Sequence, residues 1–177
     1  MSSSRRATVT MPSDREIVIT RELDAPRALV FEAWTRPEHV ARWWDPSGAP
    51  LAECEIDLRP EGAFRFVHQG PDGPAHLFTG VYLEITPPER LVFSTPILPS
   101  RAEAVGTLVF SEREGQTTLA LNIKCESKAD RDALLQMHVD VGTTRTLDNL
   151  DRYLGAYLRP GDRSPSMTVS VLDDTER

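Results

Sequence analysis

The fold is decided by the stretch PEHVARWWDP, residues 37–46, which holds two adjacent tryptophans near its end. Pro37 suits the first turn of a helix, where its missing N–H costs nothing, and the closing proline cannot continue a helix. Val40, Trp43 and Trp44 recur at i, i+3 and i+4 and therefore share one helical face. So short a helix is marginal on its own. Since each indole can bury about 150–250 Å², we expect the pair to cover a core, a partner or the mouth of a cavity.

Composition places the chain among ordinary globular domains. Its 177 residues, 40% hydrophobic and 27% charged, are enough for one domain with a substantial core. The net charge of −7 argues against binding to nucleic acid or to an anionic membrane, because both select a basic face. No apolar run approaches the roughly 20 residues of a membrane-spanning helix.

The two cysteines indicate the cellular compartment of the protein. Cys54 and Cys125 are far apart and form no Cys-x-x-Cys motif. This favours two reduced, buried thiols in a cytoplasmic protein. The N-terminal residues have no apolar stretch behind their charges, so they are not expected to act as a secretory signal.

Sequence texture divides the chain into three parts. We expect a disordered lead at 1–14, one domain at 15–158 and a flexible tail at 159–177. The domain begins with an alternating pattern typical of a strand at 17–23 and a helical pattern at 24–34. The tryptophan helix follows at once.

The pattern changes at Leu51 to strands separated by turns rich in Gly and Pro. A long amphipathic helix at 127–158 then closes the domain, because apolar residues recur there every three or four positions. The expected strands are 53–58, 63–69, 75–85, 91–95, 105–113 and 116–126.

This order predicts an α+β fold with one antiparallel sheet of about six to seven strands. One long helix can cover only part of one face of a flat sheet, so we expect the sheet to curve strongly around the C-terminal helix. Such an arrangement leaves a space between helix and sheet. The two short helices after the first strand can close one end of that space.

Motifs for nucleophilic, phosphate or metal chemistry are absent: there is no Gly-x-Ser-x-Gly, Walker-type or His-Glu-x-x-His pattern. His68 and His76 lie symmetrically about a turn and could be cross-strand neighbours. A zinc site needs three or four ligands, so we predict neither a metal nor another cofactor. His138 either faces the cavity or lies at the helix edge. We expect a structural ion pair, rather than catalysis, from Glu84 and Arg90.

Aromatic side chains concentrate in the predicted strands. Phe64, Phe66 and His68 share one face of their strand. Such a stripe is either plain core or the lining of a pocket, since ligand sites are mostly apolar with a few polar groups. The candidate lining residues are Trp34, Trp43, Trp44, Phe64, Phe66, His68, Phe78, Tyr82, Phe93, Met137, His138 and Val141.

Four stretches in consistent order form a family pattern. They are RPEHVARWW at 36–44, DLRPEGAFR at 57–65, GVYLEITPPERLVF at 80–93, and Gly142 followed by TLDNL at 146–150. Together they resemble the family of homologues of the activator of heat-shock protein 90 ATPase. The resemblance covers about residues 15–158.

The resemblance implies the START-like helix-grip fold, with a deep apolar cavity between a curved sheet and the C-terminal helix. Members often carry aromatics near the glycine of that helix, where this chain has Val139 and Thr143. If these two residues face the cavity, it is larger or differently shaped. Relatives bind lipids, polyketides, hormones or aromatics, or assist a chaperone. The eukaryotic activator contacts its client through an additional N-terminal domain.

Three functions fit these patterns. We favour a non-enzymatic binder of a small hydrophobic molecule, held in the cavity. A cyclase- or hydratase-like enzyme could use the same cavity, with His138, His68, Glu84 or Tyr82 as acid or base. A chaperone-linked module could act through an acidic surface. Both a monomer and a homodimer stay open.

Overall fold

Eight strands and four helices make up the part of the chain that the computed structural model describes, residues 6–70, 73, 75–97 and 100–157. In chain order they are β1 (Thr8–Thr10), β2 (Glu16–Leu23), α1 (Arg27–Thr35), α2 (Pro37–Trp43), β3 (Glu53–Ile56), β4 (Ala63–His68), β5 (His76–Thr86), β6 (Arg90–Ile97), β7 (Ala102–Arg113), β8 (Gln116–Lys124), α3 (Lys128–Gln136) and α4 (Val139–Tyr157). The strands form one antiparallel sheet in the order β1-β2-β8-β7-β6-β5-β4-β3.

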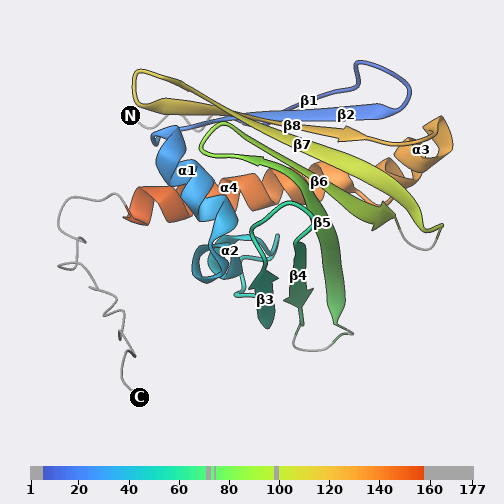
Figure 1. Ribbon diagram of the computed structural model, residues 1–177, viewed down its shortest axis with the longest axis horizontal. Helices are drawn as coiled ribbons and strands as arrows, with labels where there is room; N and C mark the ends of the chain where they lie inside the picture. Colours follow the sequence, from blue (N-terminus) through green and yellow to red (C-terminus); the bar gives the residue numbers. More distant parts are fainter. Residues whose placement is uncertain (1–5, 71–72, 74, 98–99, 158–177) are drawn as a thin grey trace.

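The sheet curves around α4, with α1 and α2 toward one end of that helix and α3 at the other (Figure 1). Alternate residues of the strands turn inward, so Ile19 of β2 and Leu119 of β8 are buried in the same core as Leu147 and Leu150 of α4. Helix and sheet thus cover each other's apolar faces. The α+β helix-grip fold predicted from the sequence is confirmed.

The sheet has one strand more than the six or seven expected. Thr8–Thr10, which lie within the segment 1–14 interpreted as a disordered lead, form β1 and pair with β2 through Thr8↔Thr20 and Thr10↔Val18. Three residues are too few for a recognisable alternation, which is why the pattern missed the strand. The tail at 159–177 lies outside the described residues.

The single helix expected at 127–158 is wrong, because the structure divides it into α3 and α4. Ser127 caps α3 by accepting a hydrogen bond from the Asp130 N–H at 3.1 Å. The helix stops at Met137, and His138 takes a left-handed φ of +58°. No glycine or proline marks this break, and the apolar period runs through it, so the sequence pattern carries no sign of it.

The short tryptophan helix forms as expected, with Pro37 in its first turn. Trp43 is wholly buried, and its indole N–H donates to the Ala33 carbonyl of α1 at 3.1 Å. Its ring stands edge-on to Trp34, with ring centroids 4.8 Å apart. The two short helices are therefore joined through the tryptophans at the end of α1 and of α2.

Helix α4 binds the end of α2 through side chains of the TLDNL stretch. The Thr146 hydroxyl donates to the Trp44 carbonyl at 3.0 Å, and the Asn149 amide donates to the Asp45 carbonyl at 2.7 Å. The last carbonyls of a helix have no partner within it. Thr146 and Asn149 supply hydrogen bonds to carbonyls at the end of α2, while Leu147 and Leu150 are buried in the core.

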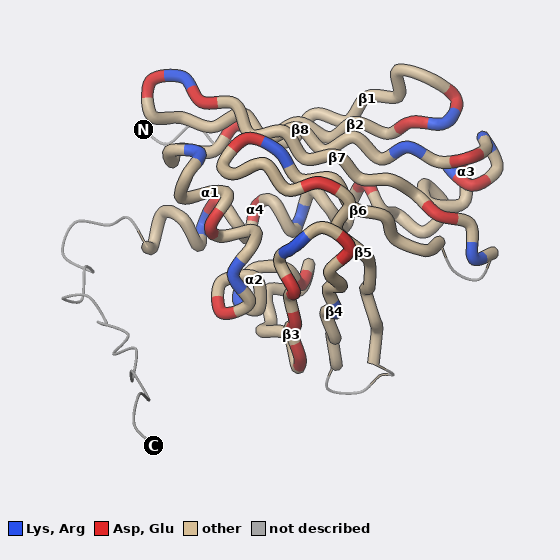
Figure 2. Tube along the Cα trace, in the orientation of Figure 1, with Lys and Arg blue, Asp and Glu red and all other residues tan. Residues whose placement is uncertain are grey.

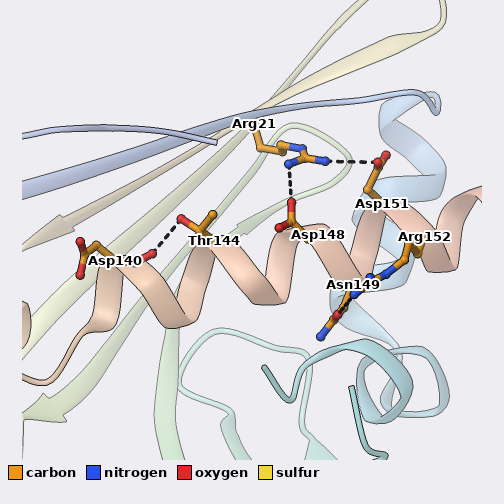
Figure 3. Close-up of polar contacts among 7 residues, drawn as sticks. All are labelled: Arg21, Asp140, Thr144, Asp148, Asn149, Asp151 and Arg152. Atoms are coloured by element: carbon orange, nitrogen blue, oxygen red, sulfur yellow. Dashed lines mark hydrogen bonds and ion pairs between the residues drawn. The ribbon is translucent and has the colours of Figure 1, made fainter. Parts of the chain in front are cut away.

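A buried arginine joins the opposite side of α4 to the sheet (Figure 3). Arg21 of β2 is only 2% exposed, and its guanidinium contacts Asp148 at 2.6 Å and Asp151 at 3.2 Å. The two carboxylates are 46% and 36% exposed. Side chains on two sides of α4 thus hold it in place, one set against the sheet and one against α2.

Candidate functional site

A cavity of about 400 Å³ lies between the inner face of the sheet and the first half of α4. Strands β6 to β8 form its floor, and the ends of α1 and α2, the start of β5 and the α3–α4 junction complete it. Its lining residues are Trp34, Trp44, Pro46, Leu77, Phe78, Phe93, Thr95, Pro96, Ile97, Ala104, Gly106, Leu121, Ile123, Leu134, Met137, His138, Val139, Gly142, Thr143, Thr146 and Leu147.

The floor is shaped by a large residue beside a small one. Phe93 of β6 lies directly opposite Gly106 of β7 in the sheet register. A Cβ atom added to Gly106 would stand 2.3 Å from the Phe93 ring, so only glycine leaves room for this ring position. The ring of Phe93 therefore lies across β7 and forms part of the cavity wall.

Few polar groups of the wall are free to bind a ligand. The Thr95 hydroxyl donates to the Thr79 carbonyl at 2.7 Å, and Thr146 is occupied by the Trp44 carbonyl. The Trp34 indole nitrogen has no hydrogen-bond partner among the described residues, but the atom is itself buried. The side-chain polar groups of Thr143 and His138 also bond to no described residue. The cavity wall is thus apolar, with few polar groups available to a ligand.

Exposed lining residues show where the cavity meets solvent. Leu77 at the start of β5 is 54% exposed, and Met137 at the α3–α4 junction is 60% exposed. Pro46 and Pro96 are exposed as well. The break that separates α3 from α4 therefore places Met137 and His138 at the opening.

Six of the twelve candidate residues line this cavity: Trp34, Trp44, Phe78, Phe93, Met137 and His138. Phe64, Phe66 and Tyr82 lie beside it, around a void of about 20 Å³ that shares Trp44, Phe78 and Phe93 with the cavity. They form the aromatic layer behind the wall, with Phe64 and Phe93 ring centroids 5.6 Å apart. Whether the six contact a ligand stays a prediction.

Of the remaining three candidates, His68 lines a separate hollow described below, and Trp43 and Val141 line neither space. Trp43 turns into the core, because residues that follow each other in a helical conformation point about 100° apart, and Trp44 takes the cavity side. Val141 is 44% exposed, since it lies two residues from both Val139 and Thr143 and so on another side of α4. Val139 and Thr143 do line the cavity. The resemblance implies that a cavity lined by these two residues, in place of the aromatics of relatives, is larger or differently shaped.

The sequence reasoning missed the aliphatic floor and one acid. Leu121 and Ile123 belong to an alternating strand pattern, but alternation alone does not say which face looks inward. Ile97 and Ala104 lie outside the expected strands 91–95 and 105–113, because the structure extends β6 to Ile97 and begins β7 at Ala102. Asp45 was missed altogether. Nothing in its neighbourhood indicates that it meets a residue of β4.

A second hollow, of about 440 Å³, adjoins the first across Trp44 and Phe78. It contains His68 and His76, which are cross-strand partners as the hairpin symmetry predicted, with stacked rings 6.0 Å apart. Asp45 meets His68 there. Within the described part of the chain, no group of three or more His, Cys, Asp or Glu residues is placed to hold a metal ion.

The remaining titratable candidates differ in their environment. Burial, with a smaller contribution from Cys54, raises the pKa of the Tyr82 phenol, so this group stays protonated. Burial likewise raises the pKa of the free Cys54 thiol to about 11. Glu84 and Arg90 form the expected ion pair, 3.3 Å apart on the exposed surface.

Fold and cavity together define a helix-grip protein with an apolar space between its curved sheet and its C-terminal helix. The chain belongs to the family described as Activator of Hsp90 ATPase homolog 1-like protein, whose model matches residues 24–155. Comparison with curated proteins gives no match. Among the helices that the structure describes, none is long and apolar enough to span a membrane.

Solved structures from several bacteria share the fold. A protein from Rhodobacter sphaeroides is 26% identical, with a TM-score of 0.77 over 86% of this chain and 99% of its own. CalU16 from Micromonospora echinospora is 26% identical, with a TM-score of 0.58 over 89% of this chain and 88% of its own. A protein from Nitrosomonas europaea, 24% identical, aligns with a TM-score of 0.73 over 81% of this chain and 96% of its own.

Proposed function

We propose that the cavity binds a small hydrophobic molecule, such as a lipid, a polyketide or an aromatic compound. The observation that supports this function is a space of about 400 Å³ whose wall is almost entirely apolar. Ligand pockets of proteins commonly measure about 300–1,000 Å³ and combine such walls with a few polar groups. Transfer of apolar ligand surface from water into this space is the driving force.

Contacts within the protein hold the cavity wall in place without a ligand. Trp44 packs against Phe66 and Phe78, with centroids 4.9 Å and 5.2 Å apart, and α4 fixes its carbonyl through Thr146. A site that is already formed loses little conformational entropy on binding. Binding therefore needs only entry through the opening near Leu77 and Met137.

A matched pair of substitutions tests this function. Val139→Phe places a ring into the cavity, whereas Val141→Phe, two residues along the same helix, places the same ring in solvent. We expect Val139→Phe to weaken binding of 2-methylnaphthalene at least about tenfold, because the ring takes up ligand space worth 1.4 kcal/mol or more. Val141→Phe should bind like the unsubstituted protein. The measurement is fluorescence titration of the tryptophans, with Trp34 and Trp44 in the wall.

Two results would count against the function. One is the absence of any fluorescence or thermal-shift response across a panel of fatty acids, hydroxylated polyketides and two-ring aromatics. The other is an equal loss of affinity in Val139→Phe and Val141→Phe, which would place binding outside the cavity.

The chaperone-linked function has less support. Figure 2 shows Lys and Arg interspersed with Asp and Glu along the described trace. The acidic contact surface on which that function depends thus has no particular location here. A pull-down with the heat-shock protein 90 homologue of the host, using Val139→Phe as a control that should bind equally, separates the two functions.

We propose the cytoplasm as the location, because both cysteines are free thiols.

A further inference from the structure

The hollow beside the cavity contains a carboxylate held in a fixed position. Asp45 follows the tryptophan pair, and its side chain is only 2% exposed. Its Oδ1 accepts the backbone N–H of Ser47 at 2.9 Å, and its main-chain carbonyl accepts the Asn149 amide at 2.7 Å. A buried carboxylate is costly unless it is paired. Helix α4 and the turn after α2 therefore hold this charge in a defined orientation.

The partner of that carboxylate is His68, at the end of β4. Nδ1 of His68 and Oδ2 of Asp45 form an ion-pair contact, and neither atom has a hydrogen-bond partner among the described residues. A carboxylate only accepts hydrogen bonds, so the proton of this contact is on Nδ1. The stacked ring of His76 limits rotation of the His68 ring. The other ring nitrogen, Nε2, is left to form a hydrogen bond with a ligand.

Nε2 is the nitrogen of this ring that has no partner in the described part of the chain. Among the described residues nothing hydrogen-bonds to Nε2 of His68, and the ring forms part of the wall of the hollow together with Trp44, Phe66 and Phe78. The arrangement resembles the way in which pockets orient ligands, with one directed polar atom in an apolar surround.

The hollow and the cavity are neighbours with a common wall. Trp44, Pro46, Leu77 and Phe78 line both. A ligand whose apolar part lies in the cavity can therefore extend past these residues toward His68. Flat rings suit the aromatic side chains that line this path.

We propose that the ligand is a hydroxylated aromatic molecule whose phenolic hydroxyl forms a hydrogen bond with Nε2 of His68, while Asp45 fixes the orientation of that ring. This deepens the proposed function and rests on it. A phenol fits better than an unsubstituted hydrocarbon, because the hydrocarbon would leave Nε2 without a partner once the hollow is dry. Asn149 is a positioning residue, since it holds the backbone of Asp45.

A ligand-by-variant cycle tests the proposal by isothermal titration calorimetry. The ligands are 2-naphthol and 2-methylnaphthalene, which match in shape, and the proteins are the unsubstituted chain, His68→Phe and the control Val141→Phe. The ratio of the two affinities cancels their different transfer from water. We expect His68→Phe to lower the ratio in favour of 2-naphthol about tenfold, the effect of one hydrogen bond in a dry site. Val141→Phe places its ring in solvent, outside both the cavity and the hollow, and should leave the ratio unchanged.

A second readout does not depend on the folding of the variants. Titration of the unsubstituted protein with 2-naphthol should shift the ¹⁵N resonance of Nε2 of His68, and 2-methylnaphthalene should leave it in place. The proposal is overturned if both ligands bind but the affinity ratio is the same in His68→Phe and the Nε2 resonance does not move. In that case the proposed function survives. Failure of both ligands to bind the unsubstituted protein overturns the proposed function itself.

Discussion

Trp43→Ala is expected to lower the free energy of unfolding by about 3–5 kcal/mol, the range for removal of a large aromatic side chain from a core. Trp43 is wholly buried, stands edge-on to Trp34 and donates its indole N–H to the Ala33 carbonyl. The substitution removes all of these contacts and leaves a space between α1 and α2. Urea unfolding followed by circular dichroism measures the loss.

The neighbouring tryptophan supplies the control for this prediction. Trp44 is only half-buried and lines the cavity, so Trp44→Ala should cost less stability but change ligand binding. Trp43→Phe keeps a ring and loses the hydrogen bond, for a loss of about 1–3 kcal/mol. Equal destabilisation by Trp43→Ala and Trp44→Ala would show that the two indoles do not divide structure and binding between them.

The double substitution Asp148→Ala/Asp151→Ala is expected to cost about 3 kcal/mol of unfolding free energy. It leaves the Arg21 guanidinium, 2% exposed, without its two ion-pair partners. Loss of one side of a buried ion pair is strongly destabilising because the other charge stays buried and uncompensated. We place the value at the lower end of the usual range, since both carboxylates are themselves partly solvated.

The converse substitution, Arg21→Met, separates the cost of an uncompensated buried charge from simple loss of contacts. Arg21→Met removes the buried charge and keeps the apolar stem, while the two carboxylates can turn to water. We expect a markedly smaller loss than in the double alanine variant, measured by the same urea titration. A larger loss in Arg21→Met would mean that the arginine acts mainly through its packing.

Local pattern predicted the elements whose causes are local. Pro37 and the spacing of the tryptophans indicate α2, and the symmetry of the hairpin pairs His68 with His76. The ion pair of Glu84 and Arg90 follows from the turn between their strands. In each case, residues close in the sequence determine the geometry, so periodicity and turn chemistry suffice.

Long-range geometry accounts for what the sequence did not show. The break at His138 has no glycine or proline, and only the backbone angle reveals it. The contact of Asp45 with His68 joins the end of α2 to β4, and no spacing rule connects the two. The sequence spacing predicts that Trp43 and Trp44 share a helical face. In the structure Trp43 lies in the core and Trp44 lies in the cavity wall.

The most direct test of ligand binding in the cavity is to locate a bound probe by intermolecular nuclear Overhauser effects. With 2-methylnaphthalene, we predict contacts from ligand protons to the methyl groups of Ile123 and Leu147, which line the cavity. Leu83 and Val109 are the controls, because their methyl groups are exposed on the surface and do not line the cavity. Contacts confined to Leu83 and Val109, or no contacts at saturating probe, would contradict the proposal that this protein holds its ligand between sheet and helix.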